Sequence, residues 1–199
     1  MVTAHADLDG DGRADRIQIK RRETVSPVAG SMIDIDLAGE GGMEAYMDTG
    51  HAPEQLLEPP VRLGDGGREQ LLATRSEGGS TELLVIGWDG FSDSPGVIHP
   101  DTRLRPAAGL DGQGRMTGFY VDADGLHSWR TLEPVDPAGS TEVEVEEWSW
   151  SIRYDLPVEV AQGEGRNAPY KTEYIRTGLE PTSEGTRCAD ISTDTAESC

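Results

Sequence analysis

The chain has 199 residues and carries 17 Lys and Arg against 37 Asp and Glu, which gives a net charge of -20 at pH 7. A surface this acidic repels nucleic acids and anionic membranes, so we expect neither as a partner. No apolar run is long enough to span a membrane, and 25 Gly with 12 Pro favour many turns between short strands, as in an all-β fold.

The first feature of the chain is an acidic loop at residues 7–15, with the sequence Asp-Leu-Asp-Gly-Asp-Gly-Arg-Ala-Asp. Alternate carboxylates suit Ca²⁺, which binds carboxylate, carbonyl and water oxygens, and Gly12 stands where the chain must turn sharply. The predicted ligands are the side chains of Asp7, Asp9, Asp11 and Asp15 and the backbone carbonyl of Arg13. The alternative is an acidic turn that binds no metal.

Two features separate this loop from an EF-hand. Its twelfth position would be Gln18, which cannot supply a bidentate carboxylate, and residues 16–20 alternate polar and apolar as a strand does. The pattern Asp-x-Asp-Gly-Asp-Gly-x-x-Asp resembles instead the calcium loop of the FG-GAP/VCBS repeat family, found in the blades of integrin-like β-propellers. The resemblance covers residues 7–15 and implies propeller-like blades, a structural Ca²⁺ and surfaces that bind proteins or glycans.

Short segments between Gly, Pro and Asp turns follow the loop. Residues 31–37 alternate cleanly and predict a strand. Residues 52–58 favour one or two helical turns, which Pro59 would end. Residues 69–74 predict a further strand.

The middle of the chain contains a strand and a hairpin. Residues 81–88 include four consecutive apolar residues, 83–86, which predict a strand buried on both faces. Residues 115–121 and 126–132 predict two strands joined across the Asp-Ala-Asp-Gly turn.

The clearest predicted strand covers residues 141–154. Its apolar residues change phase at Glu146-Glu147, which predicts a β-bulge or a bend there. Trp148 and Trp150 share one face of this strand and could form a stacking platform for a sugar or peptide. The alternative, which we favour, is that both rings fill the core.

The Gly-rich turn recurs faintly along the chain. Residues 10–17 align with 64–71 and with 110–119, at intervals of about 50 residues, which is the size of a propeller blade. Most of the acidic ligands are missing from the later copies, so a single metal site is predicted. The expected domain spans residues 1–180, with three degenerate blade-like repeats at about 5–60, 61–108 and 109–180. A small or incomplete propeller is expected, and a β-sandwich or barrel is the alternative.

A last strand is predicted at residues 171–177, and residues 181–199 form a polar tail that contains Cys188 and Cys199. A disulfide between them would stabilise the tail by about 3 kcal/mol and would require an oxidising compartment. The alternative is two free thiols, as in a cytosolic partner-binding domain. Because cytosolic Ca²⁺ is scarce, the acidic loop favours an exported protein, secreted or at the cell surface, and we expect a longer precursor before Met1.

No catalytic residues are predicted. The four histidines are not spaced as zinc ligands, and the chain has no Gly-x-Ser-x-Gly nucleophile elbow. The sequence therefore predicts an exported, acidic, calcium-binding domain with a protein- or glycan-binding role rather than an enzyme. The alternative is a secreted glycan hydrolase with a carboxylate pair beside the Trp platform.

Overall fold

The computed structural model describes residues 2–21, 31–38, 44–48, 55–64, 67–77, 79–89, 94–100, 106–135, 142–161, 171–190 and 195–197. These residues form fourteen β-strands and contain no helix, which confirms the all-β class. Neither of the two sheets closes on itself within the described residues. No helix in this part of the chain could span a membrane.

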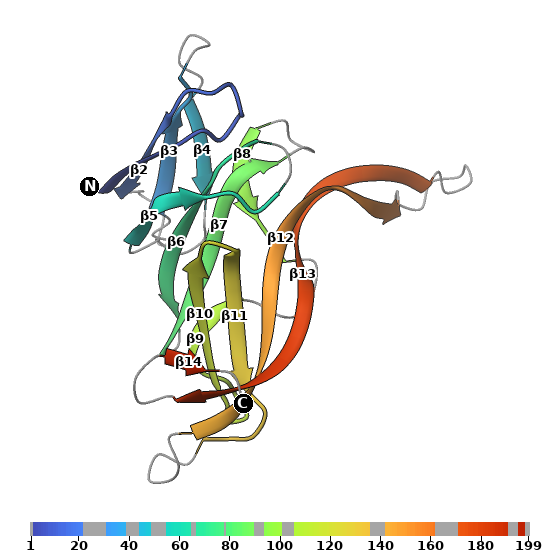
Figure 1. Ribbon diagram of the computed structural model, residues 1–199. Helices are drawn as coiled ribbons and strands as arrows, with labels where there is room; N and C mark the ends of the chain where they lie inside the picture. Colours follow the sequence, from blue (N-terminus) through green and yellow to red (C-terminus); the bar gives the residue numbers. More distant parts are fainter. Residues whose placement is uncertain are drawn as a thin grey trace.

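The strands follow one another in three antiparallel meanders (Figure 1). The first meander contains β1 (Val2–Ala6), β2 (Asp15–Arg21), β3 (Ser31–Asp36) and β4 (Glu44–Asp48). The second contains β5 (Gln55–Val61), β6 (Gln70–Glu77), β7 (Ser80–Asp89) and β8 (Ser94–Ile98). The third contains β9 (Ala107–Leu110), β10 (Met116–Asp122), β11 (Gly125–Thr131) and β12 (Glu142–Ala161), and β13 (Lys171–Asp190) and β14 (Thr195–Glu197) extend it.

The meanders are joined in two different ways. The first forms a four-stranded sheet of its own. In the second and third, β7 pairs with β9 at Thr81↔Ala108 and Glu82↔Ala107, so both belong to one ten-stranded sheet. Pairing of β12 with β13 runs to Asp190, which places part of the polar segment 181–199 in the sheet.

The second meander is buried on both faces. Side chains at alternate positions face the first meander in one apolar cluster, which includes Leu71, Ala73, Leu84, Ile86, Ile17 and Ile33. The intervening positions face the third meander in a second cluster, which includes Leu72, Leu83, Val85, Leu126, Trp148 and Leu179. This arrangement confirms the prediction that residues 83–86 lie in a strand covered on both sides.

Each meander begins with a hairpin, and the repeated Gly-rich turn closes all three. The turns lie between β1 and β2, between β5 and β6, and between β9 and β10. Each contains a Gly-Arg pair whose glycine has a left-handed backbone, at Gly12 (φ 85), Gly67 (φ 71) and Gly114 (φ 77). The three hairpins therefore share one turn feature, because only glycine adopts this conformation without strain.

The prediction of helical turns at residues 52–58 is wrong for the part that the structure describes, because β5 begins at Gln55. Leu56 packs in the first cluster and Leu57 against the second, so adjacent apolar residues serve opposite faces of a sheet. The pairing of β5 with β6 is irregular between Leu57 and Val61. The prolines within β5 fall at this irregularity, where a missing amide hydrogen costs little.

The β-bulge predicted at Glu146-Glu147 is also wrong. β12 pairs with β11 without interruption from Val145 to Trp150, and the register shift between β12 and β13 lies between Ser149 and Trp150. The apolar phase changes because the covered face changes along the strand. Val145 is buried on one face, whereas Trp148 and Trp150 are buried on the other.

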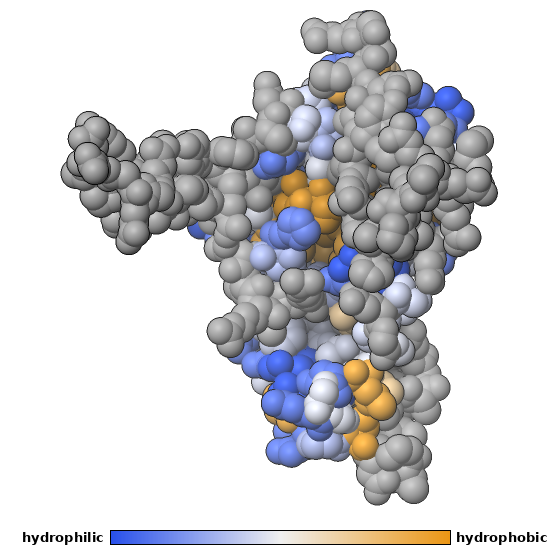
Figure 2. All heavy atoms as spheres, turned by 180° about the vertical axis from the view of Figure 1, so that it is seen from behind, coloured by the Kyte–Doolittle hydropathy of each residue, from blue (hydrophilic) through white to orange (hydrophobic). Residues whose placement is uncertain are grey.

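The surface is largely hydrophilic where the side chains are described. Three large apolar side chains are exposed among these residues, Leu110, Val121 and Leu132. Figure 2 shows apolar patches on the rear face with hydrophilic residues beside them.

Candidate metal centre

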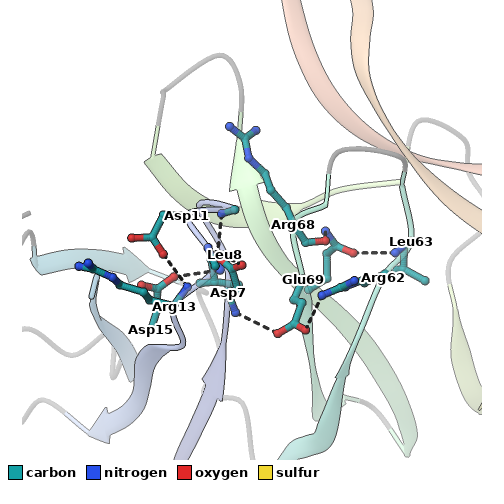
Figure 3. Close-up of polar contacts among 12 residues, drawn as sticks. Asp7, Leu8, Asp11, Arg13, Asp15, Arg62, Leu63, Arg68 and Glu69 are labelled. Atoms are coloured by element: carbon teal, nitrogen blue, oxygen red, sulfur yellow. Dashed lines mark hydrogen bonds and ion pairs between the residues drawn. The ribbon is translucent and has the colours of Figure 1, made fainter. Parts of the chain in front are cut away.

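Three of the predicted ligands lie together at the end of the first hairpin. Asp7 follows β1, Asp9 lies in the loop and Asp15 begins β2, and each offers a carboxylate oxygen within 4.8 Å of the other two. Ala6 and Asp15 are partners in the β1–β2 register, so the hairpin itself brings the two ends of the loop together. Figure 3 shows Asp7, Asp11 and Asp15 around this loop.

Backbone amides of the loop fold around its own carboxylates. Gly10 N–H and Gly12 N–H donate to the two oxygens of Asp7, at 2.9 and 3.0 Å, and Asp11 N–H donates to Asp9 at 3.0 Å. Gly10 and Gly12 have φ values of 81° and 85°, in the left-handed region that favours glycine. The two glycines therefore allow the loop to turn back on Asp7.

Asp15 is the most deeply placed carboxylate of the group, with no solvent exposure. Leu8 N–H and Ala38 N–H donate to its two oxygens at 2.9 and 2.7 Å. Burial raises the pKa of Asp15 above its usual value, the two amide hydrogen bonds oppose that rise, and the charges of Asp9 and Asp11 add to it. A cation would offset the electrostatic cost of ionising this carboxyl group.

The structure places Asp11 and Arg13 differently from the other predicted ligands. Both are exposed, and Asp11 accepts a hydrogen bond from Arg13 N–H at 2.7 Å. Asp11 does not belong to the group of three converging carboxylates. The loop thus collects three of its four Asp side chains, and Asp11 would have to turn inward to become a ligand.

The second hairpin loop docks directly against this centre. Glu69 N–H donates to the Asp7 carbonyl at 2.8 Å, and Asp7 N–H donates to Glu69 Oε2 at 3.0 Å. Arg68 Nε donates to the Asp9 carbonyl at 3.1 Å. Figure 3 shows Glu69 of the neighbouring hairpin directed toward Asp7 of the acidic loop. The repeat alignment pairs Glu69 with Asp15, but sequence reasoning did not predict contact between the two loops.

Arg68 also links the two apolar clusters. Its guanidinium carbon lies 5.3 Å from the centre of the Trp88 ring and 5.7 Å from that of Tyr154. Trp88 packs on the first cluster and Tyr154 on the second. Burial raises the pKa of Tyr154, and the positive charge of Arg68 opposes that rise.

In the third hairpin loop an arginine pairs with the acid, whereas in the first loop several acids converge. Asp111 accepts from Gln113 N–H and Arg115 N–H at 2.8 and 3.0 Å, and the Arg115 guanidinium lies 2.8 Å from its other oxygen. Of the residues that the structure describes, Asp7, Asp9 and Asp15 form the one group of three potential metal ligands. A guanidinium therefore compensates the carboxylate charge of the third loop.

The Trp platform is not present at the predicted position. Trp148 and Trp150 are only 6% and 4% exposed and belong to the second apolar cluster. The indole Nε1 of Trp150 donates to Ser128 Oγ at 2.7 Å inside the sheet. Neither ring offers a free face to a sugar, so the glycan hydrolase alternative loses the feature that motivated it.

The predicted disulfide falls outside the described residues, because Cys199 is not among them. The backbone of Cys188 lies in β13, opposite Glu144 on one side and Glu197 on the other.

Comparison of the chain with protein-family models, with curated proteins and with solved structures gave no match. The resemblance to the FG-GAP/VCBS family therefore rests on the acidic loop at residues 7–15.

Proposed function

We propose that the protein is an exported calcium-binding domain in which one Ca²⁺ stabilises the junction between the first and second meanders. One observation carries this proposal, namely the convergence of Asp7, Asp9 and Asp15 oxygens within 4.8 Å on a loop of matching sequence. The protein would present its acidic surface to an extracellular protein or glycan, as the family resemblance implies.

The chemistry of the group favours a hard divalent cation. Like charges at this separation repel one another, and a divalent ion converts the repulsion into attraction. All three converging ligands are carboxylates, without the imidazole or thiolate that zinc prefers. An irregular loop with further oxygens in reach suits Ca²⁺ better than Mg²⁺, which demands near-octahedral geometry. Asp11, the Arg13 carbonyl and water would complete the shell.

The position of the loop determines what the ion would do. Because Asp7 and Asp9 also hold Glu69 and Arg68 through their backbone atoms, fixing the loop also fixes its contact with the second hairpin. A ligand that binds only the folded state stabilises it by about 2.7 kcal/mol at a concentration one hundred times its Kd. The expected role is structural.

The test is a calorimetric Ca²⁺ titration of chelator-stripped protein. Melting curves are recorded for the calcium-free and the calcium-saturated protein. We expect binding of about one equivalent and a rise in Tm, because the ion relieves repulsion that exists only in the folded loop. Asp9→Ala should abolish both effects, since it removes one of the three converging carboxylates.

Asp124→Ala is the matched control, because Asp124 is an exposed acid in the turn between β10 and β11. It should bind Ca²⁺ like the unaltered protein. No binding at millimolar Ca²⁺, or equal binding by the Asp9→Ala variant, would show that residues 7–15 are an acidic turn and not a calcium site.

A further inference from the structure

The face of the third meander that points away from the apolar clusters carries an ordered row of polar side chains. Tyr120, His127 and Ser149 are consecutive partners across β10, β11 and β12. Leu126 and Trp150, the next register pair, are buried in the second apolar cluster. Because side chains alternate between faces along a strand, His127 and Ser149 lie on the opposite, outer face.

Two hydrogen bonds connect a serine, a histidine and an aspartate on this face. Ser149 Oγ lies 3.2 Å from His127 Nδ1, and His127 Nε2 lies 3.1 Å from Asp122 Oδ1. An ionised carboxylate can only accept, so Nε2 carries the proton in this contact. Nδ1 of the neutral imidazole is then an acceptor, and the Ser149 hydroxyl donates to it. This is the direction of hydrogen bonding that activates a serine nucleophile.

The surroundings hold the imidazole in this orientation. The rings of Tyr120 and His127 stack with centroids 4.8 Å apart and an interplanar angle of 8°. The Tyr120 hydroxyl donates to Glu147 at 2.5 Å, which fixes the stacking ring in turn. Asp122 is held by Asp124 N–H at 2.8 Å. The His127 side chain is only 12% exposed, so the base is both oriented and shielded.

From this geometry we propose that Ser149 is a nucleophile toward neutral carboxylic esters, with His127 as its general base and Asp122 as the residue that positions the imidazole. Ser149 Oγ attacks the ester carbonyl carbon while its proton passes to His127 Nδ1. The bond from carbon to the alkoxide oxygen then breaks, the alkoxide takes the proton from Nδ1, and the products are an acyl-serine and an alcohol. Water repeats the sequence and releases the carboxylic acid.

The charges of the outer face set the substrate class. In the same row Asp122 contacts His127 and Glu147 contacts Tyr120, and the whole chain carries a net charge of -20. Anionic esters are therefore disfavoured, and the proposed substrates are uncharged esters.

A fluorophosphonate probe tests the proposal on the full-length chain, because it traps an activated serine irreversibly as fluoride leaves. Peptide mapping should place the adduct on Ser149, and p-nitrophenyl acetate should be hydrolysed at a rate that the probe abolishes. Ser151, two residues further along the same face of β12, is the internal control and should stay unlabelled. Absence of an adduct at Ser149, or equal labelling of Ser151, would overturn the proposal.

Two variants test the base and its positioning residue separately. His127→Gln should slow labelling by about 10²-fold, the contribution typical of a general base. Asp122→Asn should slow it as well, because an amide nitrogen facing Nε2 favours the tautomer in which Nδ1 carries the proton. The Asp122 side chain is 45% exposed, so this variant puts the fold at little risk. Labelling at unchanged rates in both variants would show that His127 and Asp122 do not activate Ser149.

Discussion

The residues that balance negative charge differ among the three hairpin loops. All three loops contain a Gly-Arg pair, but only the first leaves its arginine exposed and gathers carboxylates. Arg68 in the second loop donates to the neighbouring backbone and lies over two aromatic rings. Arg115 in the third loop binds Asp111 directly. The third loop therefore carries its own cation, whereas the first would take one from solution under the proposed function.

Asp111 provides a prediction about pH. Burial raises the pKa of Asp111, but hydrogen bonds from Arg115 N–H and Gln113 N–H and the Arg115 guanidinium outweigh this, so the pKa of Asp111 is lowered from its ordinary value. A carboxyl group with a lowered folded-state pKa stabilises the protein above its unfolded pKa and loses that contribution as the pH falls through the folded value. Asp111→Asn should therefore unfold more easily than the unaltered protein at pH 7.

Urea unfolding at a series of pH values measures this difference. The deficit of the Asp111→Asn variant should shrink as the pH falls below about 3.8, the value of the unpaired group. Asp124→Asn, an exposed acid in the next turn, should show little deficit at any pH. A deficit for Asp111→Asn that stays constant across this range would contradict the electrostatic explanation.

The candidate site was readable from the sequence only where its residues are neighbours in the chain. Asp7, Asp9 and Asp15 fall in one short loop, so their spacing was enough to predict that they converge. Arg68 and Glu69 contact that loop from the next hairpin, and His127 meets Ser149 across two paired strands. Such contacts depend on packing and strand register, which the sequence pattern of a single element does not determine.

At the scale of elements, the apolar pattern predicted strands well where it was regular, as in β3 and β7, and failed where it was irregular, as in β5 and β12. Residues 31–37 alternate, and β3 lies there. In β5, adjacent leucines face opposite clusters, and the absence of alternation made the segment look helical. In β12 the buried face changes along the strand, which imitated a bulge. Both errors have the same cause. The pattern of apolar residues shows which side chains are buried, and it indicates the backbone conformation only indirectly.

Gly118 in β10 provides a prediction about strand packing. A Cβ atom added there would lie 2.5 Å from two ring carbons of Trp129 on the adjacent strand. Gly118→Ala should therefore displace the indole and lower the free energy of unfolding by about 1–3 kcal/mol, as other overpacked positions do. Urea unfolding followed by Trp fluorescence measures both effects.

Gly112→Ala is the matched control, because a Cβ atom at Gly112 would meet no atom within 4 Å. It should leave both the unfolding curve and the fluorescence nearly unchanged. Similar curves for the two variants would mean that Trp129 does not lie against Gly118.

At the scale of the whole molecule, the second meander is the structural centre. Its strands supply side chains to both apolar clusters, so the first and third meanders are packed on either side of it. The all-β class and the two-sided burial of residues 83–86 followed from composition and from an unbroken apolar run. The division into two sheets could not be predicted from the sequence, because it depends on which strand edges pair, as β7 and β9 do.

Adjacent leucines of β7 test this arrangement. Leu84 belongs to the first cluster and Leu83 to the second, and both are at least nine-tenths buried. Leu84→Ala and Leu83→Ala should each lower the free energy of unfolding by about 2–5 kcal/mol, the cost of a cavity in a core. Calorimetric or urea unfolding measures the loss.

Leu110→Ala serves as the control, since Leu110 is 60% exposed, and it should change the free energy of unfolding by less than about 0.5 kcal/mol. If only one of the two β7 variants were destabilised, the strand would be covered on a single face.

The separation of the first meander from the ten-stranded sheet has a mechanical consequence. Within the described residues, no strand of β1–β4 pairs with a strand of the other sheet, whereas β7 and β9 join the second and third meanders through their backbones. Under a pulling force, apolar faces slide apart more readily than paired strands that must break several hydrogen bonds at once. The first meander would thus detach before the rest. With calcium bound as proposed, the acidic loop, which contacts the second hairpin, would make the rupture force depend on the calcium concentration.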